Sequence, residues 1–346
     1  MSHLNPHLFW INGYSSRRKG ESGEHFGTYT AEYRLSYLME KNYIDRDEAQ
    51  DFLDASGLVD FHWEITWPED FDLPDEMLVD RLANVQGYVV WVHGWTGNMR
   101  IWEDLPARVV KKNRRLVSIA IDHNGFGESI FDDITPEMDS CNPPAAMRTL
   151  QRFVDLIKIR RQRGQVGNKV INFVGHSMGG ATLFYLNTMR WSYGEVTRFA
   201  IAPALLLEDS THRAFYTSLG LGIGILQHIP ALEVIERLVK PSVLRTLVSG
   251  ASEYVKNIHD RQYGDTPRGI TGATFMGHEG QYRPLCRRLH PALSQCRGRL
   301  LLAYGGKCWG CPSDVELAQC CVWRHRGRDP AFPFDMAIVA LRPEQH

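Results

Sequence analysis

A serine flanked by two glycines is the part of this sequence whose residue types and spacing best suit catalysis. The stretch Gly175-His176-Ser177-Met178-Gly179 follows a short, mostly apolar run (169–174) and precedes residues compatible with a helix. A serine at such a strand-to-helix junction must adopt a strained backbone conformation, and the two glycines remove Cβ atoms that would collide there. The pattern predicts a nucleophile elbow, in which the Ser177 hydroxyl stands at the tip of a sheet.

Two further apolar runs, each ending in a glycine-containing turn, place this serine in a larger pattern. Residues 87–92 end in His93-Gly94-Trp95, and residues 116–121 end in the motif Asp122-x-x-Gly125-x-Gly127-x-Ser129. Helix-like segments separate the three runs. This alternation predicts a parallel sheet with helices on both faces, with the chemistry at the carboxyl ends of the strands.

With these motifs the chain resembles the α/β-hydrolase superfamily, in particular its lipase- and esterase-like members, from about residue 61 to residue 304. The resemblance implies that Ser177 is the nucleophile. It also implies an oxyanion hole made by the backbone N–H groups of Met178 and Trp95, because a tetrahedral intermediate needs two fixed donors near its oxygen. The expected fold is therefore the α/β-hydrolase fold, a mostly parallel sheet with helices on both faces and a helical lid insertion.

The order of elements divides the chain into four segments. Residues 1–60 are a polar N-terminal extension, and residues 61–206 are the first part of the hydrolase core. Residues 207–297 have helical character and many apolar side chains, so we expect a lid that either packs on the sheet or lines an acyl-chain pocket. Residues 298–346 hold the last part of the core and an atypical cysteine-rich tail. We expect helices at 29–39, 45–55, 100–110 and 143–161, and strands at 61–67, 196–206 and 299–304 in addition to the three runs above.

The partners that a catalytic serine requires are harder to place. A serine hydroxyl needs a histidine base that is oriented by a carboxylate, and in this family the chain order is serine, acid, histidine. The acid normally follows the strand at 299–304, but Cys308 stands there, and a thiol is a poor replacement. Asp314 in the same loop is our candidate for the acid. Glu208 and Asp209, after the preceding strand, are the alternative, and all three also fit solvated loop carboxylates.

The base must lie beyond the acid, where the sequence offers His325 and His346. We assign the role to His325, which lies in a basic stretch unlike the usual histidine loop. The leading function is a serine hydrolase that cleaves a carboxylic ester. The incomplete triad leaves open a catalytically impaired protein that serves as a binding module or is a decayed gene product. Acyl transfer to an acceptor other than water would use the same residues.

Composition sets the remaining limits. The 346 residues are 43% hydrophobic and 23% charged, which suits a soluble globular core, and the net charge of −1 gives no support for nucleic-acid binding. The sequence shows neither a transmembrane run nor a signal-peptide pattern, which favours the cytoplasm. An odd cysteine count argues against a disulfide framework, and the spacing of the tail cysteines does not match a known zinc site. We therefore expect no cofactor or metal, and a small ester with an apolar part as the ligand.

Overall fold

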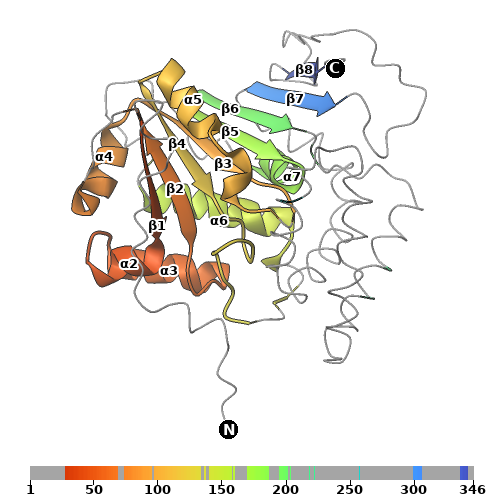
Figure 1. Ribbon diagram of the computed structural model, residues 1–346. Helices are drawn as coiled ribbons and strands as arrows, with labels where there is room; N and C mark the ends of the chain where they lie inside the picture. The colour runs from red at the N-terminus through yellow and green to blue at the C-terminus, as the bar shows by residue number, and fades with distance from the viewer. Residues whose placement is uncertain are drawn as a thin grey trace.

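The computed structural model describes the chain in most detail up to the sixth strand, together with two later strands (Figure 1). The described residues are 28–68, 74–95, 97–133, 136–137, 140–157, 159, 170–186, 195–201, 203, 218, 222, 257, 299–305 and 336–341. They form a sheet with helices on both faces, as the sequence predicts.

The sheet is mixed at one side and parallel over the rest. Within the described residues it has eight strands in the order β1-β2-β4-β3-β5-β6-β7-β8. The pairs β1–β2 and β2–β4 are antiparallel, and every other neighbouring pair is parallel. The strands are β1 (Tyr29–Arg34), β2 (His62–Trp67), β3 (Gly87–Val92), β4 (Leu116–Ile121), β5 (Val170–His176), β6 (Glu195–Ile201), β7 (Arg299–Gly305) and β8 (Met336–Leu341).

Helices cover both faces of this sheet, with α5 on one face and α6 on the other (Figure 1). On the α6 face, Trp63 of β2 packs against Phe153 of α6, with ring centroids 4.9 Å apart. On the α5 face, Trp91 of β3 packs against Trp102, with centroids 5.0 Å apart. The helical elements are α2 (Leu35–Glu40), α3 (Arg46–Ser56), the 3₁₀ turn η2 (Asp75–Met77), α4 (Leu78–Asn84), the 3₁₀ turn η3 (Met99–Trp102), α5 (Leu105–Lys112), α6 (Pro143–Leu156) and α7 (Met178–Tyr185).

The N-terminal segment contributes a strand that the sequence analysis did not predict. The helix expected at 29–39 is wrong for its first half, because Tyr29–Arg34 is strand β1 and only Leu35–Glu40 is helical. In β1, the buried apolar residues Tyr29, Ala31 and Tyr33 alternate with polar ones, which is the period of two that a strand with one face on the core shows. β1 pairs with β2 along its whole length. The sheet therefore includes a strand from the segment 1–60.

Three other expected elements are correctly placed but differ in extent. The helix expected at 100–110 is two elements, η3 and α5, because Glu103 between them has φ 48° and Pro106 stands in the first turn of α5. The helix expected at 143–161 begins at Pro143 but ends at Leu156, where the amide of Ile159 already bonds the carbonyl of Val154. The strand expected at 196–206 ends at Ile201.

The remaining expectations for the core are confirmed, with one strand added. Helix α3, strand β2 and strand β7 lie where the sequence places them, and β8 is a strand that we did not predict. Most of the lid segment 207–297 and most of the cysteine-rich tail lie outside the described residues. In the part of the chain that the structure describes, no helix is long and apolar enough to cross a membrane.

Candidate active site

Ser177 occupies a strained backbone conformation between β5 and α7. Its φ of 51° and ψ of −114° lie outside the regions that residues with a Cβ normally adopt. Such strain persists only where the surrounding structure enforces it, and it concentrates at functional sites. Here the Ser177 N–H donates to the carbonyl of Ile201 in β6 at 3.0 Å. The geometry is the sharp turn that the sequence predicts.

The two flanking glycines are required by backbone contacts. A Cβ on Gly175 would lie 2.5 Å from the carbonyl oxygen of Gly179, and a Cβ on Gly179 would overlap the carbonyl oxygens of Val92 and His93. Backbone oxygens cannot move aside as the end of a flexible side chain can. These contacts hold α7 against the carboxyl end of β3.

The loop that follows β3 lies directly against the elbow. We call residues 93–99 the oxyanion loop. A Cβ on Gly94 would lie 3.1 Å from the Ser177 Cβ and 3.0 Å from the His176 Nδ1 atom, so this loop and the serine are in close contact. Trp95, the predicted oxyanion donor, directly follows Gly94. The structure thus brings Trp95 and Ser177 to the same edge of the sheet.

Met178, the other predicted oxyanion donor, is the first residue of α7. The first N–H groups of a helix have no intrahelical acceptor and carry the positive end of the helix dipole. A developing negative charge beside Ser177 would therefore meet donors from the start of α7. Two segments that the resemblance names for an oxyanion hole are adjacent in space.

Both ends of the oxyanion loop are bound by neighbouring residues at the end of β4. At its far end, the Met99 N–H donates to Asp122 Oδ1 at 2.7 Å. At its near end, the His123 N–H donates to His93 Nε2 at 2.8 Å. Because a backbone N–H can only donate, His93 carries its proton on Nδ1, which then donates to the Gly94 carbonyl at 2.6 Å. The loop is held by a defined histidine tautomer and a buried carboxylate.

The histidines around this loop differ in charge state, because burial acts on all of them and carboxylate partners outweigh it at only one. It lowers the pKa of His93 and lowers that of His123 well below 6.5; for His123, the positive charge that His93 can acquire acts in the same direction. Both rings are therefore neutral near pH 7. Burial also opposes a charge on His62, but hydrogen bonds and attraction from Asp122 and Glu32 outweigh it and raise its pKa from 6.5 to about 9. His62 is charged where the other two are not.

His62 was not predicted from the sequence, and Asp122 was recognised there only as part of a motif. The signal that could have identified Asp122 is its spacing to Gly127 in the motif. The structure explains this spacing, because Gly127 has φ 59° and a Cβ there would overlap the Asp122 carboxylate. His62 carries no comparable local signal, because its partner is 60 positions away in the sequence. Only the pairing of β2 with β4 brings the two together.

The predicted base and acid lie outside the described residues, as do the other positions considered for them: His325, Asp314, Cys308, Glu208 and Asp209. Among the residues that are described, no group of three or more His, Cys, Asp or Glu side chains is arranged to hold a metal ion. The described part of the site therefore consists of the strained serine, the start of α7 and the oxyanion loop.

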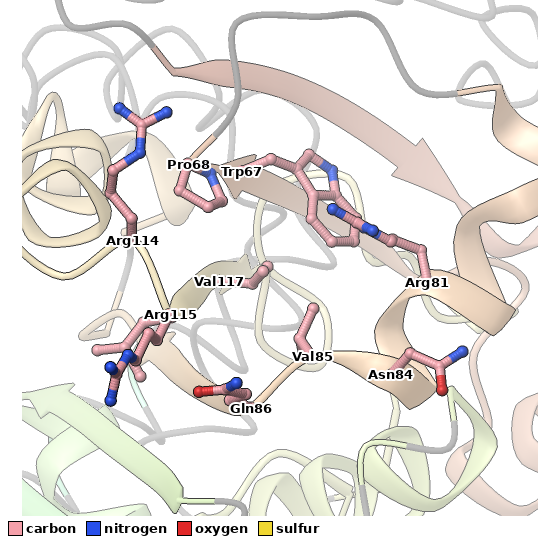
Figure 2. Close-up of a pocket in the computed structure, with 10 residues that line it drawn as sticks. Trp67, Pro68, Arg81, Asn84, Val85, Gln86, Arg114, Arg115 and Val117 are labelled. Carbon is pink, nitrogen blue, oxygen red and sulfur yellow. The ribbon is translucent and has the colours of Figure 1, made fainter.

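A cavity of about 200 Å³ opens at the opposite edge of the sheet, where β3 and β4 begin (Figure 2). Trp67, Arg81, Arg114 and Arg115 are among the residues that line it, and Ser177 is not. Figure 2 shows Arg81 on one side of the cavity and Arg114 and Arg115 on the other, without a common point toward which the three side chains converge. Since parallel sheets of this type place their chemistry at the carboxyl ends of the strands, we do not assign catalysis to this cavity.

The fold and the elbow together define a class of protein. A mostly parallel sheet, a strained serine at a strand-to-helix turn and a glycine loop against it are the features of an α/β hydrolase. The model of the alpha/beta hydrolase family matches residues 89–344. The chain belongs to this family.

Several solved structures share the fold at low sequence identity. A putative epoxide hydrolase from Klebsiella pneumoniae superposes with a TM-score of 0.50 at 12% identity, covering 81% of this chain and 86% of that chain. An enol-lactonase from Burkholderia xenovorans gives 0.47 at 14% identity, covering 72% and 78%. A putative acyltransferase from Salmonella enterica gives 0.46 at 20% identity, covering 72% and 75%. No curated protein matches the sequence significantly. At these identities the similarity concerns the fold alone.

Proposed function

We propose that this protein is a serine hydrolase that cleaves a carboxylic ester with an apolar acyl or alcohol part. The observation that carries the proposal is the conformation of Ser177, with φ 51° and ψ −114°, in contact with the oxyanion loop. A strained serine is costly to maintain. A purely structural turn at this position would be served equally well by glycine, which adopts positive φ without strain.

In the proposed reaction, the Ser177 Oγ attacks the ester carbonyl carbon while a base takes the hydroxyl proton. The oxygen of the tetrahedral intermediate accepts hydrogen bonds from the N–H groups of Met178 and Trp95. Collapse of the intermediate expels the alcohol, which receives the proton from the base, and leaves an acyl group on Ser177. The same base then takes a proton from water, which attacks the acyl carbon. Release of the acid leaves Ser177, and the base returns the proton to its Oγ.

His325 is the proposed base and Asp314 the proposed acid. Replacing either by alanine should lower turnover by roughly 10⁴-fold or more if they act in this way. If Cys308 occupies the acid position and His325 lacks its carboxylate, Cys308→Asp should instead raise the rate. If none of the three substitutions changes the turnover rate, the residues named here do not form a triad.

Labelling by a fluorophosphonate tests the proposal directly, because this reagent reacts only with an activated serine. We expect labelling at Ser177, identified by mass spectrometry of the modified peptide, and loss of labelling and of p-nitrophenyl ester hydrolysis in Ser177→Ala. Ser56→Ala is a matched control, since in the described part of the chain the Ser56 hydroxyl bonds only the Leu53 carbonyl within α3, at 3.0 Å. A folded wild-type protein that is never labelled would favour the non-catalytic alternative. Hydrolysis that survives Ser177→Ala would exclude this serine as the nucleophile.

A further inference from the structure

Asp122 is the point at which several segments of the active-site edge meet. Its Oδ1 accepts the N–H of Met99 at the end of the oxyanion loop, at 2.7 Å. Its Oδ2 accepts the N–H of Glu128 at 2.9 Å. Its side chain is buried, so each lost bond would leave a polar group without water to replace it. The orientation of this carboxylate therefore sets where the oxyanion loop ends.

His62 of β2 binds the Asp122 carboxylate. Its Nδ1 lies 2.8 Å from Asp122 Oδ2, and both side chains are 2% exposed. The backbones of the two residues are also joined, since the Asp122 N–H donates to the His62 carbonyl at 3.1 Å. Ser129 closes the unit: its hydroxyl donates to the Asp122 carbonyl at 3.0 Å and accepts the His62 N–H at 3.0 Å. The pair is thus fixed through both side chains and main chain.

We infer that His62 is a positioning residue for the oxyanion loop: it orients Asp122, which in turn fixes Met99 and the donor segment in front of Ser177. This inference rests on the proposed function of Ser177. His62 does not act on substrate, because Asp122 and the end of β4 lie between it and the loop. Its contribution is to hold the oxyanion donors in place before the reaction begins.

Each element that packs against His62 carries a charged group. On β1, Glu32 Oε2 lies 3.7 Å from the His62 Nε2 atom, and on β2, Glu64 stands directly opposite Glu32 in the strand register. Arg100 of η3 lies 3.4 Å from Glu32 and 3.9 Å from Glu128, and Glu128 also pairs with Arg34. Burial and the charge of Glu32 raise the pKa of Glu64 to about 7, although His62 and Arg100 oppose that shift. His62 is the cation that neutralises the inner, buried part of this network.

The charge of His62 gives the inference a pH signature. Its pKa is raised from 6.5 to about 9, so the attraction to Asp122 is complete below pH 6.5 and is lost as the pH rises through about 9. The rate of fluorophosphonate labelling should therefore fall in that upper range. A residue that only filled space would give no such step.

Two substitutions at His62 separate its two hydrogen bonds. The side-chain nitrogen of asparagine takes the place of Nδ1 and keeps the donor to Asp122, whereas that of glutamine takes the place of Nε2 and faces Glu32. We expect His62→Gln to lower the labelling rate of Ser177 by about 10²-fold near neutral pH. His62→Asn should stay within a few-fold of wild type and lose the alkaline step. Thr66→Val is the control, because Thr66 lies on the same face of β2 as His62. Among the described residues, its hydroxyl bonds only the Thr30 hydroxyl, at 3.2 Å.

Nuclear magnetic resonance supplies a readout that does not depend on activity. The Met99 N–H resonance should titrate together with the His62 ring, with a midpoint near pH 9, and this step should be absent in His62→Asn. If Ser177 is never labelled but this linked titration is present, the proposed function fails and the coupling of His62 to the loop stands. Equal labelling rates for the asparagine and glutamine variants would overturn the inference. So would a Met99 N–H resonance that does not titrate with the His62 ring.

Discussion

The two edges of the sheet differ in what surrounds their glycines. At the carboxyl edge, a Cβ on Gly179 would overlap the carbonyl oxygens of Val92 and His93, which belong to the backbone of the sheet. At the amino edge, the closest atom to a Cβ on Gly87 is the end of the Leu116 side chain, at 2.6 Å. A side-chain end can rotate away, but a backbone carbonyl cannot. The fold therefore tolerates an added Cβ at Gly87 more readily than at Gly179.

The carboxyl edge also has a buried carboxylate that joins several of its segments. The Asp122 carboxylate accepts bonds from Met99, Glu128 and His62. Both edges contain a buried nitrogen without a hydrogen-bond partner among the described residues, Trp67 Nε1 at the amino edge and His123 Nε2 at the carboxyl edge. The edges therefore differ in how their loops are anchored and not in how completely their polar groups are paired.

The largest effect is expected from a methyl group at Gly179. In a helix, alanine is more favourable than glycine by about 1 kcal/mol, but overlap with two backbone oxygens should cost about 3 kcal/mol or more, so the clash wins. We expect Gly179→Ala to lower the free energy of unfolding by roughly the difference, about 2 kcal/mol, and to abolish labelling of Ser177. Denaturant unfolding and the labelling assay measure these outcomes.

Gly222→Ala provides the steric comparison for stability, because the same change there meets nothing within 4 Å. It should leave stability unchanged or slightly raised. Gly179→Ala with wild-type stability would mean that α7 can shift away from β3, and the contrast between the two edges would then be wrong.

How far the site was predictable depends on the range of the interactions. The elbow was predictable because its requirements are local: Gly175, Ser177 and Gly179 encode a single turn. Strand β1 was not, because Tyr29–Arg34 is a strand only by virtue of its pairing with β2. The His62–Asp122 pair was missed for the same reason, since it spans 60 positions. His325 and Asp314 stay predictions, because they lie outside the described residues.

The pH dependence of stability should come from the carboxyl edge. His93 and His123 have lowered pKa values, so their contribution is present above pH 6.5 and is lost as the pH falls below it. His62 has a raised pKa of about 9, so its contribution is complete below pH 6.5 and is lost as the pH rises through about 9. Glu64, with its pKa raised to about 7, acts against His93 and His123, because its contribution is lost as the pH rises through about 7. Above pH 7 the further loss is therefore expected from His62.

Denaturant unfolding from about pH 5 to about pH 10 tests this dependence. The alkaline loss should be absent in His62→Asn, which has no proton to lose in this range. An alkaline loss of unchanged size in that variant would assign the effect to other groups.

At the amino edge, a methyl group at Gly87 should have a smaller effect. The Leu116 side chain can rotate to relieve the 2.6 Å contact, although the Val170 carbonyl at 3.1 Å must also yield slightly. We expect Gly87→Ala to cost about 1 kcal/mol and to leave the labelling rate of Ser177 at its wild-type value. Thermal unfolding and labelling of the same preparation measure both. A drop in labelling without a drop in stability would show that this edge influences the catalytic one.

The smallest effect is expected from the arginines beside the cavity. Arg114 and Arg115 are exposed, and neither side chain has an ion pair among the described residues, so their removal breaks no buried network. The double substitution to alanine should change the free energy of unfolding by less than about 0.5 kcal/mol. Labelling of Ser177 should be unaffected, because the two residues stand at the start of β4 whereas the oxyanion loop is anchored at its end. Arg148→Ala with Arg152→Ala, on the exposed side of α6, removes the same charge and controls for the change in net charge. A loss of labelling confined to the Arg114 and Arg115 variant would mean that β4 transmits changes from one edge to the other, and the independence of the two edges would have to be abandoned.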